Sequence, residues 1–137
     1  MEPSAEIALL LKGLRDRSVF LRQKAARGLG HAHLATLRGT PQAAPALASA
    51  LGDSNKYVRA AAAFALARLA PERPTGVDAL VQLLGDEHRD VRLSAASALG
   101  DLGRDAKAAV PALKALASDP HPPVRLQATE ALQKIGE

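Results

Sequence analysis

Apolar residues recur along the chain at the spacing of one face of an α-helix. The clearest stripe follows i, i+4, i+7, i+8 and i+11, and its members are Val58, Ala62, Ala65, Leu66 and Leu69. A shorter apolar stretch precedes it, and a polar turn at residues 52–55 separates the two. The pattern therefore predicts pairs of antiparallel helices. No segment alternates between apolar and polar residues as a half-buried strand would.

The stripe belongs to a longer pattern that returns along the chain. Each copy of this pattern starts with an acidic residue and continues with an aliphatic-Arg pair, an Ala and an Ala-Leu pair. Three close copies start at Asp53, Asp86 and Asp119, and a looser copy starts at Asp16. Such a period indicates a stack of similar units that rest on their neighbours. We predict one all-α domain over residues 1–137, built from four helical hairpins with about eight helices of roughly 10–16 residues. The repeats fall at approximately 4–40, 41–73, 74–106 and 107–137.

The two ends of the chain depart from the pattern. The first repeat is longer than the others by four residues, roughly one helical turn, and we expect 31–40 to extend the helix that begins near Ser18. The last repeat ends at Gly136 with no extra polar helix, although the ends of such stacks normally carry a polar outer face. Three explanations stay open: the chain belongs to a longer array, the last repeat forms a homo-oligomer, or Lys114, Gln127 and Lys134 give enough polarity.

The repeated string is Asp-x-x-x-x-Val-Arg-x-x-Ala-x-x-Ala-Leu-x-x-aliphatic-small, and Ala-Val-Pro-Ala-Leu precedes its last copy at 109–113. It resembles HEAT-like repeats, especially the short bacterial type named after phycobilisome bilin lyases, over residues 5–136. The resemblance implies a right-handed α-solenoid in which the second helix of each hairpin lines the concave face. It implies little about function, because such repeats serve many unrelated roles. We expect the repeated Asp and Arg residues to pair between layers, since the planar guanidinium suits partly buried carboxylates.

Composition limits the chemistry that this stack can carry. The chain is 47% hydrophobic but 2% aromatic, so Ala, Leu and Val must form the core. The absence of cysteine excludes a disulfide framework and a thiolate site, and it is compatible with the cytoplasmic location that we expect. Neither a membrane span nor a secretory signal is expected. The net charge of +4 is uneven, with +6 on residues 1–76 (11 basic, 5 acidic) and −2 on residues 77–137 (7 basic, 9 acidic).

A binding surface is expected on the face of the second helices that packing does not require. At 100° per residue this face collects positions 60, 63, 64 and 67 and their equivalents, which are mostly small or apolar. The predicted partner-binding residues are Arg27, Ala60, Phe64, Arg68, Leu93, Ser97, Leu126 and Glu130. Contiguous exposed apolar surface usually marks an interaction site, so we expect a groove for a helix or extended segment of another, preferably acidic, protein. The alternative is that the superhelix covers these side chains itself.

Nucleic-acid binding is the main alternative function. Cations in the N-terminal half could contact phosphates: Lys12, Arg15, Arg17, Lys24, Arg27, Arg38, Lys56 and Arg68. However, the chain has no Trp, and Phe20 and Tyr57 fall in turn positions, so stacking platforms for bases are missing. The acidic third repeat would also interrupt a basic track. The sequence therefore favours a protein over nucleic acid as the partner.

An enzyme, such as the remnant of a HEAT-like lyase or hydroxylase, is the other alternative. His31 and His33 point in different directions on a helix, and His88 and His121 have no evident third ligand. The His-Glu dipeptides of HEAT-like hydroxylases are missing, as are a nucleophile elbow and a phosphate-binding glycine loop. We expect no catalytic residue, no metal and no cofactor. The sequence thus favours a non-enzymatic protein-interaction scaffold.

Overall fold

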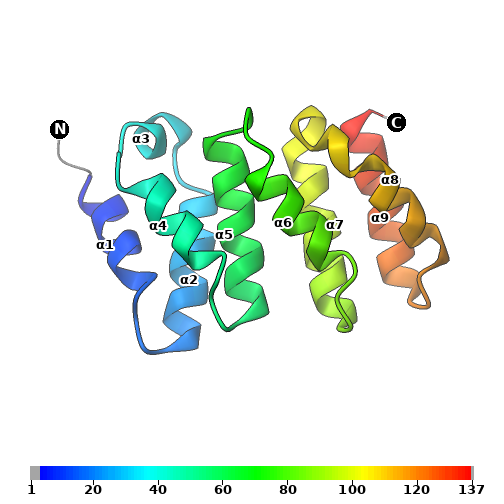
Figure 1. Cartoon of the computed structure of the whole chain (residues 1–137), viewed down its shortest axis with the longest axis horizontal. Coiled ribbons are helices and arrows are strands. Elements are labelled where there is room, and N and C mark those ends of the chain that lie inside the picture. Colours follow the sequence, from blue (N-terminus) through cyan, green and yellow to red (C-terminus); the bar gives the residue numbers. More distant parts are fainter. Residues whose placement is uncertain (1–3, 137) are drawn as a thin grey trace.

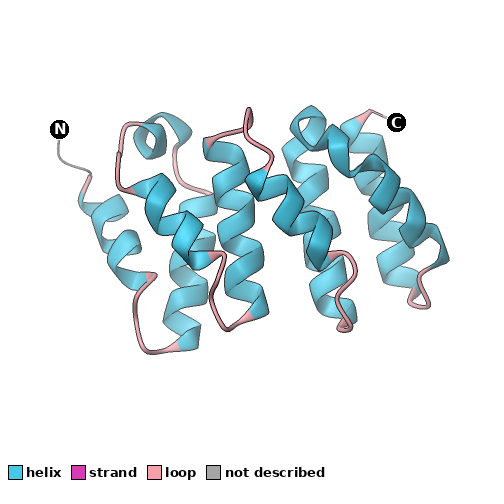
Figure 2. Ribbon diagram, in the orientation of Figure 1, coloured by secondary structure: helices cyan, strands magenta, loops and turns pink. Residues whose placement is uncertain are grey.

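The computed structural model describes residues 4–136, and every regular element in that range is a helix (Figures 1 and 2). The α-helices are α1 (Ala5–Gly13), α2 (Val19–Gly30), α3 (Leu34–Arg38), α4 (Ala43–Ala50), α5 (Lys56–Leu69), α6 (Thr75–Leu83), α7 (Arg89–Leu102), α8 (Val110–Ala115) and α9 (Pro122–Ile135). Two 3₁₀ segments, η1 (Gly103–Ala109) and η2 (Leu116–Ser118), flank α8. Within residues 4–136, no helix is long and apolar enough to cross a membrane.

Four hairpins stand side by side in a row, with the chain termini at opposite ends (Figure 1). Each hairpin pairs a first helix (α1, α4, α6 or α8) with a second helix (α2, α5, α7 or α9), and α3 is an additional short helix. The predicted all-α solenoid of four hairpins is therefore confirmed. The first helices, with 6 to 9 residues, are shorter than predicted. Prolines in or before their first turns lack the N–H that a longer helix would need there, as at Pro74 and Pro111.

The expected long helix over residues 18–40 does not form. Helix α2 ends at Gly30, and residues Leu34–Arg38 form the separate helix α3. Two glycines in the last turn of α2 weaken it by about 1 kcal/mol each relative to Ala. The change of direction also lets Leu37 become fully buried in the core of the first two repeats. Burial of a leucine contributes about 1.5–3 kcal/mol, which favours the turn over a straight extension.

The repeated apolar positions point into the stack, as the periodicity predicts. Val58, Val91 and Val124 are at most 1% exposed, and the leucines at 47, 80 and 113 are fully buried. The buried residues form two clusters, one in the first two repeats and one in the last two. Helix α5 contributes to both, because its Ala60, Ala63 and Ala67 belong to the second cluster. The junction between the second and third repeats is therefore built from small side chains.

The repeated Asp residues hold the turns between paired helices. In each repeat a carboxylate oxygen of this residue accepts a hydrogen bond of 2.9 Å from the backbone N–H two residues later, as Asp119 does from His121. This local bond is the Asx turn that favours aspartate there. Burial alone would raise the pKa of Asp86, but the N–H of His88 and the Lys56 ammonium outweigh it and lower that pKa. The hydrogen bond from Arg92 is the main reason that the pKa of Asp119 is lowered.

The expected Arg–Asp pairs form at two of the three junctions between repeats. Arg22 Nε lies 2.8 Å from Asp53 Oδ1, and Arg92 Nε lies 2.7 Å from Asp119 Oδ2. At the middle junction Lys56 Nζ approaches Asp86 instead, at 3.3 Å, while Arg59 donates to the carbonyl oxygen of Asp53 at 2.7 Å. The middle junction thus lacks the two-pronged contact that the outer junctions have.

Candidate partner-binding surface

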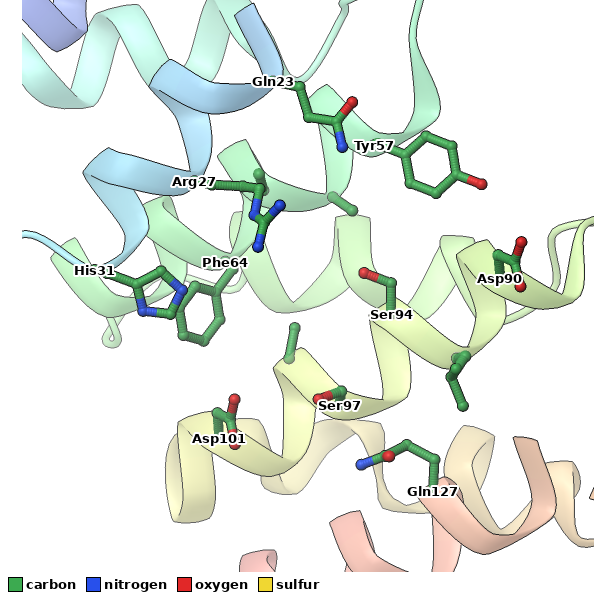
Figure 3. Close-up of a pocket in the computed structure, with 14 residues that line it drawn as sticks. Gln23, Arg27, His31, Tyr57, Phe64, Asp90, Ser94, Ser97, Asp101 and Gln127 are labelled. Carbon is green, nitrogen blue, oxygen red and sulfur yellow. The ribbon is translucent and has the colours of Figure 1, made fainter. Parts of the chain in front are cut away.

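A hollow of about 500 Å³ opens on the side of the second helices, between α2, α5 and α7 (Figure 3). We call it the central hollow. Its floor is apolar and contains Ala60 and Phe64 of α5 and Leu93 of α7. Polar groups from α2 and α7 form its walls, including Arg27 on one side and Ser94 on the other. A volume of a few hundred cubic ångströms is typical of ligand sites.

Phe64 is held in the floor by contacts with the end of α2. A Cβ atom placed on Gly30 would lie 3.0 Å from Phe64 Cδ2, so the missing side chain at Gly30 makes room for the ring. The His31 and Phe64 rings pack together at a centroid distance of 5.8 Å and an angle of 45° (Figure 3). Such tilted pairs are favourable for aromatic rings. Phe64 is consequently half-buried and keeps part of its ring available to the central hollow.

Arg27 stands over the central hollow without a partner among the residues that the structure describes. Its side chain is exposed, and within residues 4–136 it donates no hydrogen bond and joins no ion pair. Figure 3 shows its guanidinium extending into the space between α2 and α7. Arg68, on the same face of α5, differs: it donates to the carbonyl oxygens of Gly30 and Ala32, where α2 ends. Those carbonyls lack partners within the helix, so Arg68 has a structural role.

Five of the eight predicted partner-binding residues line the central hollow: Arg27, Ala60, Phe64, Leu93 and Ser97. Leu126, which is 61% exposed, and Glu130 lie on α9 outside it. Arg68 is outside it as well and is used as described above. Whether any of these residues binds a partner stays a prediction.

The expectation that the whole face is open was wrong at the positions that approach the next repeat. Ala63, Ala67 and Ala96 are at most 1% exposed, because neighbouring second helices pack against them. Small residues allow this close approach: a Cβ on Gly100 would lie 3.0 Å from Ala131 Cα. At these positions the stack covers its own side chains, which is the alternative that the sequence left open.

The walls of the central hollow include residues that the sequence analysis did not select. They lie one turn away from the selected positions, and they are His31, Tyr57, Asp90, Ser94, Asp101 and Gln127. Helix geometry offered the signal, because positions three or four residues apart share a face. Asp101 Oδ1 lies 3.1 Å from Lys134 Nζ, whereas Asp90 has only a long contact of 4.0 Å with Arg89. The hollow therefore has a cationic wall on α2 and an acidic side on α7.

The exposed face of α9 carries both polar and apolar side chains. Thr129 and Gln133 are exposed there, at positions that hold Ala63 and Ala67 in α5, and Leu126 on the same helix is exposed as well. A homo-oligomer through the last repeat stays a prediction. In the first repeat, Leu9 and Phe20 are each 70% exposed.

Metal ligands do not gather within the described part of the chain. No group of three or more His, Cys, Asp or Glu side chains there could hold an ion. His88, a possible metal ligand by sequence, lies in the turn before α7. Its Nδ1 is 2.6 Å from Nζ of Lys56.

The row of helical hairpins defines the class of this protein as an α-helical repeat solenoid. HEAT repeats match it over residues 7–100 and 77–137, and the chain belongs to this family. No curated protein matches the sequence.

Solved structures resemble the fold at low sequence identity. An engineered protein has 24% identity and a TM-score of 0.67 over 95% of this chain and 62% of its own. A designed armadillo repeat protein has 22% identity and a TM-score of 0.58 over 94% of this chain and 64% of its own. The complex of CpcE and CpcF of phycocyanin lyase from Nostoc sp. PCC7120 has 21% identity and a TM-score of 0.54, over 98% of this chain and 66% of that chain. At these identities the likeness concerns the fold alone.

Proposed function

We propose that this protein is a non-enzymatic scaffold that binds a segment of another protein in the central hollow. The observation that carries the proposal is an apolar floor, containing Phe64 and Leu93, beneath an arginine that has no partner in the described chain. Contacts within the stack account for the repeated Asp and Arg residues, but they do not require this combination. Solenoids use the surfaces of their stacked helices for extended partners, which supports a peptide or helix as the ligand. We place the protein in the cytoplasm, consistent with its lack of cysteine.

The basic residues of the N-terminal half give less support to nucleic-acid binding than their number suggests. Arg38 donates to the carbonyl oxygens of Leu69 and Arg68, and Arg68 donates to the end of α2. Lys56 is held by Asp86. These cations stabilise the stack itself, so fewer of them are free to neutralise phosphates.

A displayed library of random peptides tests the proposed function. Peptides are selected on the wild-type protein and their affinities are then measured for a variant with Phe64→Glu and Leu93→Glu. We expect at least about a tenfold loss, because a charged floor must be desolvated when a peptide covers it. Leu9→Glu is the matched control: it places the same charge on an exposed leucine of α1 that does not line the central hollow.

A second variant separates loss of binding from loss of structure. Ser94 is exposed and lines the central hollow, so Ser94→Trp fills the space without disturbing the buried core. It should also reduce binding about tenfold while the helical CD spectrum is unchanged. Selected peptides that bind both variants as well as wild type, or a selection that enriches no peptide, would contradict the proposed function.

A further inference from the structure

Most arginines within the second helices hold the stack together, whereas Arg27 of α2 faces the central hollow. One set donates to the carbonyl oxygen of the Asp in the turn between the two helices of their own repeat, at 2.6–3.0 Å: Arg22, Arg59, Arg92 and Arg125. Arg38 and Arg68 donate to carbonyls at the ends of neighbouring second helices. Arg27 occurs in the same helix as Arg22 but donates to no group within residues 4–136. Structural support of the fold therefore does not explain its position.

The surroundings of Arg27 suit a carboxylate. The apolar floor lies beside it, and the exposed Ser94 hydroxyl and the Ser97 hydroxyl face the same space from α7 (Figure 3). Within the described chain the carboxylates that line the hollow, Asp90 and Asp101, belong to α7, and neither pairs with Arg27. A planar guanidinium donates two parallel hydrogen bonds to a carboxylate. An ion pair above an apolar floor is also stronger than one in open water, because the local dielectric constant is lower.

The opposite side of the hollow carries the opposite charge. Asp90, in the first turn of α7, has a side chain that is 72% exposed, and its ion-pair contact with Arg89 is long at 4.0 Å. Asp101 is different, because Lys134 already neutralises it at 3.1 Å. The free charges of the central hollow thus run from positive on α2 to negative at the start of α7.

Resting on the proposed function, we infer that the ligand is an extended peptide segment with an acidic residue, an apolar residue and a basic residue in that spatial order across the hollow. The acidic side chain pairs with Arg27, the apolar one covers Phe64 and Leu93, and the basic one lies near Asp90. Charge complementarity of this kind fixes the orientation of a partner more than it adds affinity. The segment is therefore held in one direction along the stack.

Charge reversal in protein and peptide tests the inference. Peptides from the selection are remeasured against Arg27→Glu, which should weaken acidic binders about tenfold. A peptide whose acidic residue is replaced by Lys should recover affinity for Arg27→Glu and lose it for wild type. Arg15→Glu is the matched control: it makes the same substitution at another exposed arginine, which lies beyond the opposite end of α2 and lines neither the central hollow nor the smaller depression beside it. It should change affinity by no more than about twofold at physiological salt, because exposed charges are screened over such distances.

The outcomes distinguish the inference from the proposed function. If peptides bind in a manner that depends on Phe64 but ignore Arg27→Glu, the scaffold function stands and the charge-directed orientation is wrong. If selected peptides carry no preference for an acidic residue, the inference fails in the same way. If no peptide depends on Phe64, the proposed function itself fails. Reciprocal rescue by the Lys-bearing peptide supports the inference.

Discussion

Replacement of Arg92 or Arg59 by Ala gives a sharp test of how the repeats are held together. The two arginines occupy equivalent positions in α7 and α5, and each donates to a backbone carbonyl of its own repeat. Only Arg92 also reaches the next repeat, where Nε and Nη2 contact the two carboxylate oxygens of Asp119 at 2.7 and 3.2 Å. The pair of variants therefore isolates the contact between repeats from the contact within one.

The expected losses follow from the burial of the groups involved. The side chains of Arg92 and Asp119 are 12% and 4% exposed. Removal of one partner from a fully buried ion pair costs about 3–5 kcal/mol, while an exposed pair contributes about 1 kcal/mol or less. Arg92 keeps some contact with water and the His121 N–H still binds the carboxylate, so we expect Arg92→Ala to cost about 2–3 kcal/mol. Arg59→Ala loses one hydrogen bond from a charged, half-exposed donor to a carbonyl and should cost about 1.5 kcal/mol, the lower end for hydrogen bonds of charged groups.

Urea unfolding followed by far-ultraviolet CD measures both free energies of unfolding. The slope of the free energy against urea concentration should stay unchanged, because neither substitution alters the surface exposed on unfolding by much. Equal losses for the two variants would refute the reasoning, since they would mean that the contact between repeats adds nothing. A changed slope in one variant would show that the stack no longer unfolds as one unit, as happens in repeat proteins whose cooperativity breaks down.

Two further predictions concern packing and pH. Gly76→Ala should lower the free energy of unfolding by about 1–3 kcal/mol, because the new Cβ would lie 2.6 Å from the backbone atoms Ala63 O and Ala67 N. Gly85→Ala is the control: its Cβ would meet only Gln82 O, at 3.6 Å, so the free energy of unfolding should stay unchanged or rise slightly. The lowered pKa of Asp119 stabilises the folded state above the ordinary carboxyl value of 3.8, and this stabilisation is lost as pH falls through the folded-state value. The difference in melting temperature between wild type and Asp119→Asn should thus narrow below about pH 4, and a constant difference down to about pH 2 would contradict it.

The arrangement of helical hairpins could be predicted from the sequence because the buried positions recur at a regular period along the chain. Val58, Val91 and Val124 are buried in every copy where the stripe places them, and burial of apolar side chains decides helix orientation. The separate helix α3 could not be predicted in this way. It depends on Leu37 reaching a core that only the neighbouring repeat completes. Tertiary packing of this kind overrides local propensity.

The candidate site was predicted less completely, for reasons that two pairs of residues illustrate. Ala60 and Ala63 are small and apolar and cannot be distinguished in the sequence. Both are buried, but Ala60, at 5% exposed, still lines the central hollow, whereas Ala63 is fully covered by the next repeat. Arg27 and Arg68 share one face of the second helices, yet only Arg68 meets the carbonyls at the end of α2. Both distinctions depend on how closely neighbouring helices approach, which the period does not determine.

The junction between the second and third repeats has a depression on each side of the stack. The central hollow lies on the side of the second helices. On the other side, a second depression of about 530 Å³ lies between α4 and the start of α6. Gly76 allows α6 to lie directly on the backbone of α5, and Lys56 replaces the arginine fork that closes the outer junctions. The small residues of α5 then join two core clusters that are otherwise separate.

A ligand in the central hollow would contact both halves of the stack. The hollow is lined mainly from α2 and α5 in the first two repeats and from α7 in the third, so an occupant adds contacts across the junction between the second and third repeats. Any ligand that binds only the folded state raises the free energy of unfolding by RT ln(1 + [L]/Kd). Because this one bridges the halves, it should stabilise both together, and amide hydrogen exchange should slow in α2 as well as in α7. Protection confined to one half would place the ligand elsewhere.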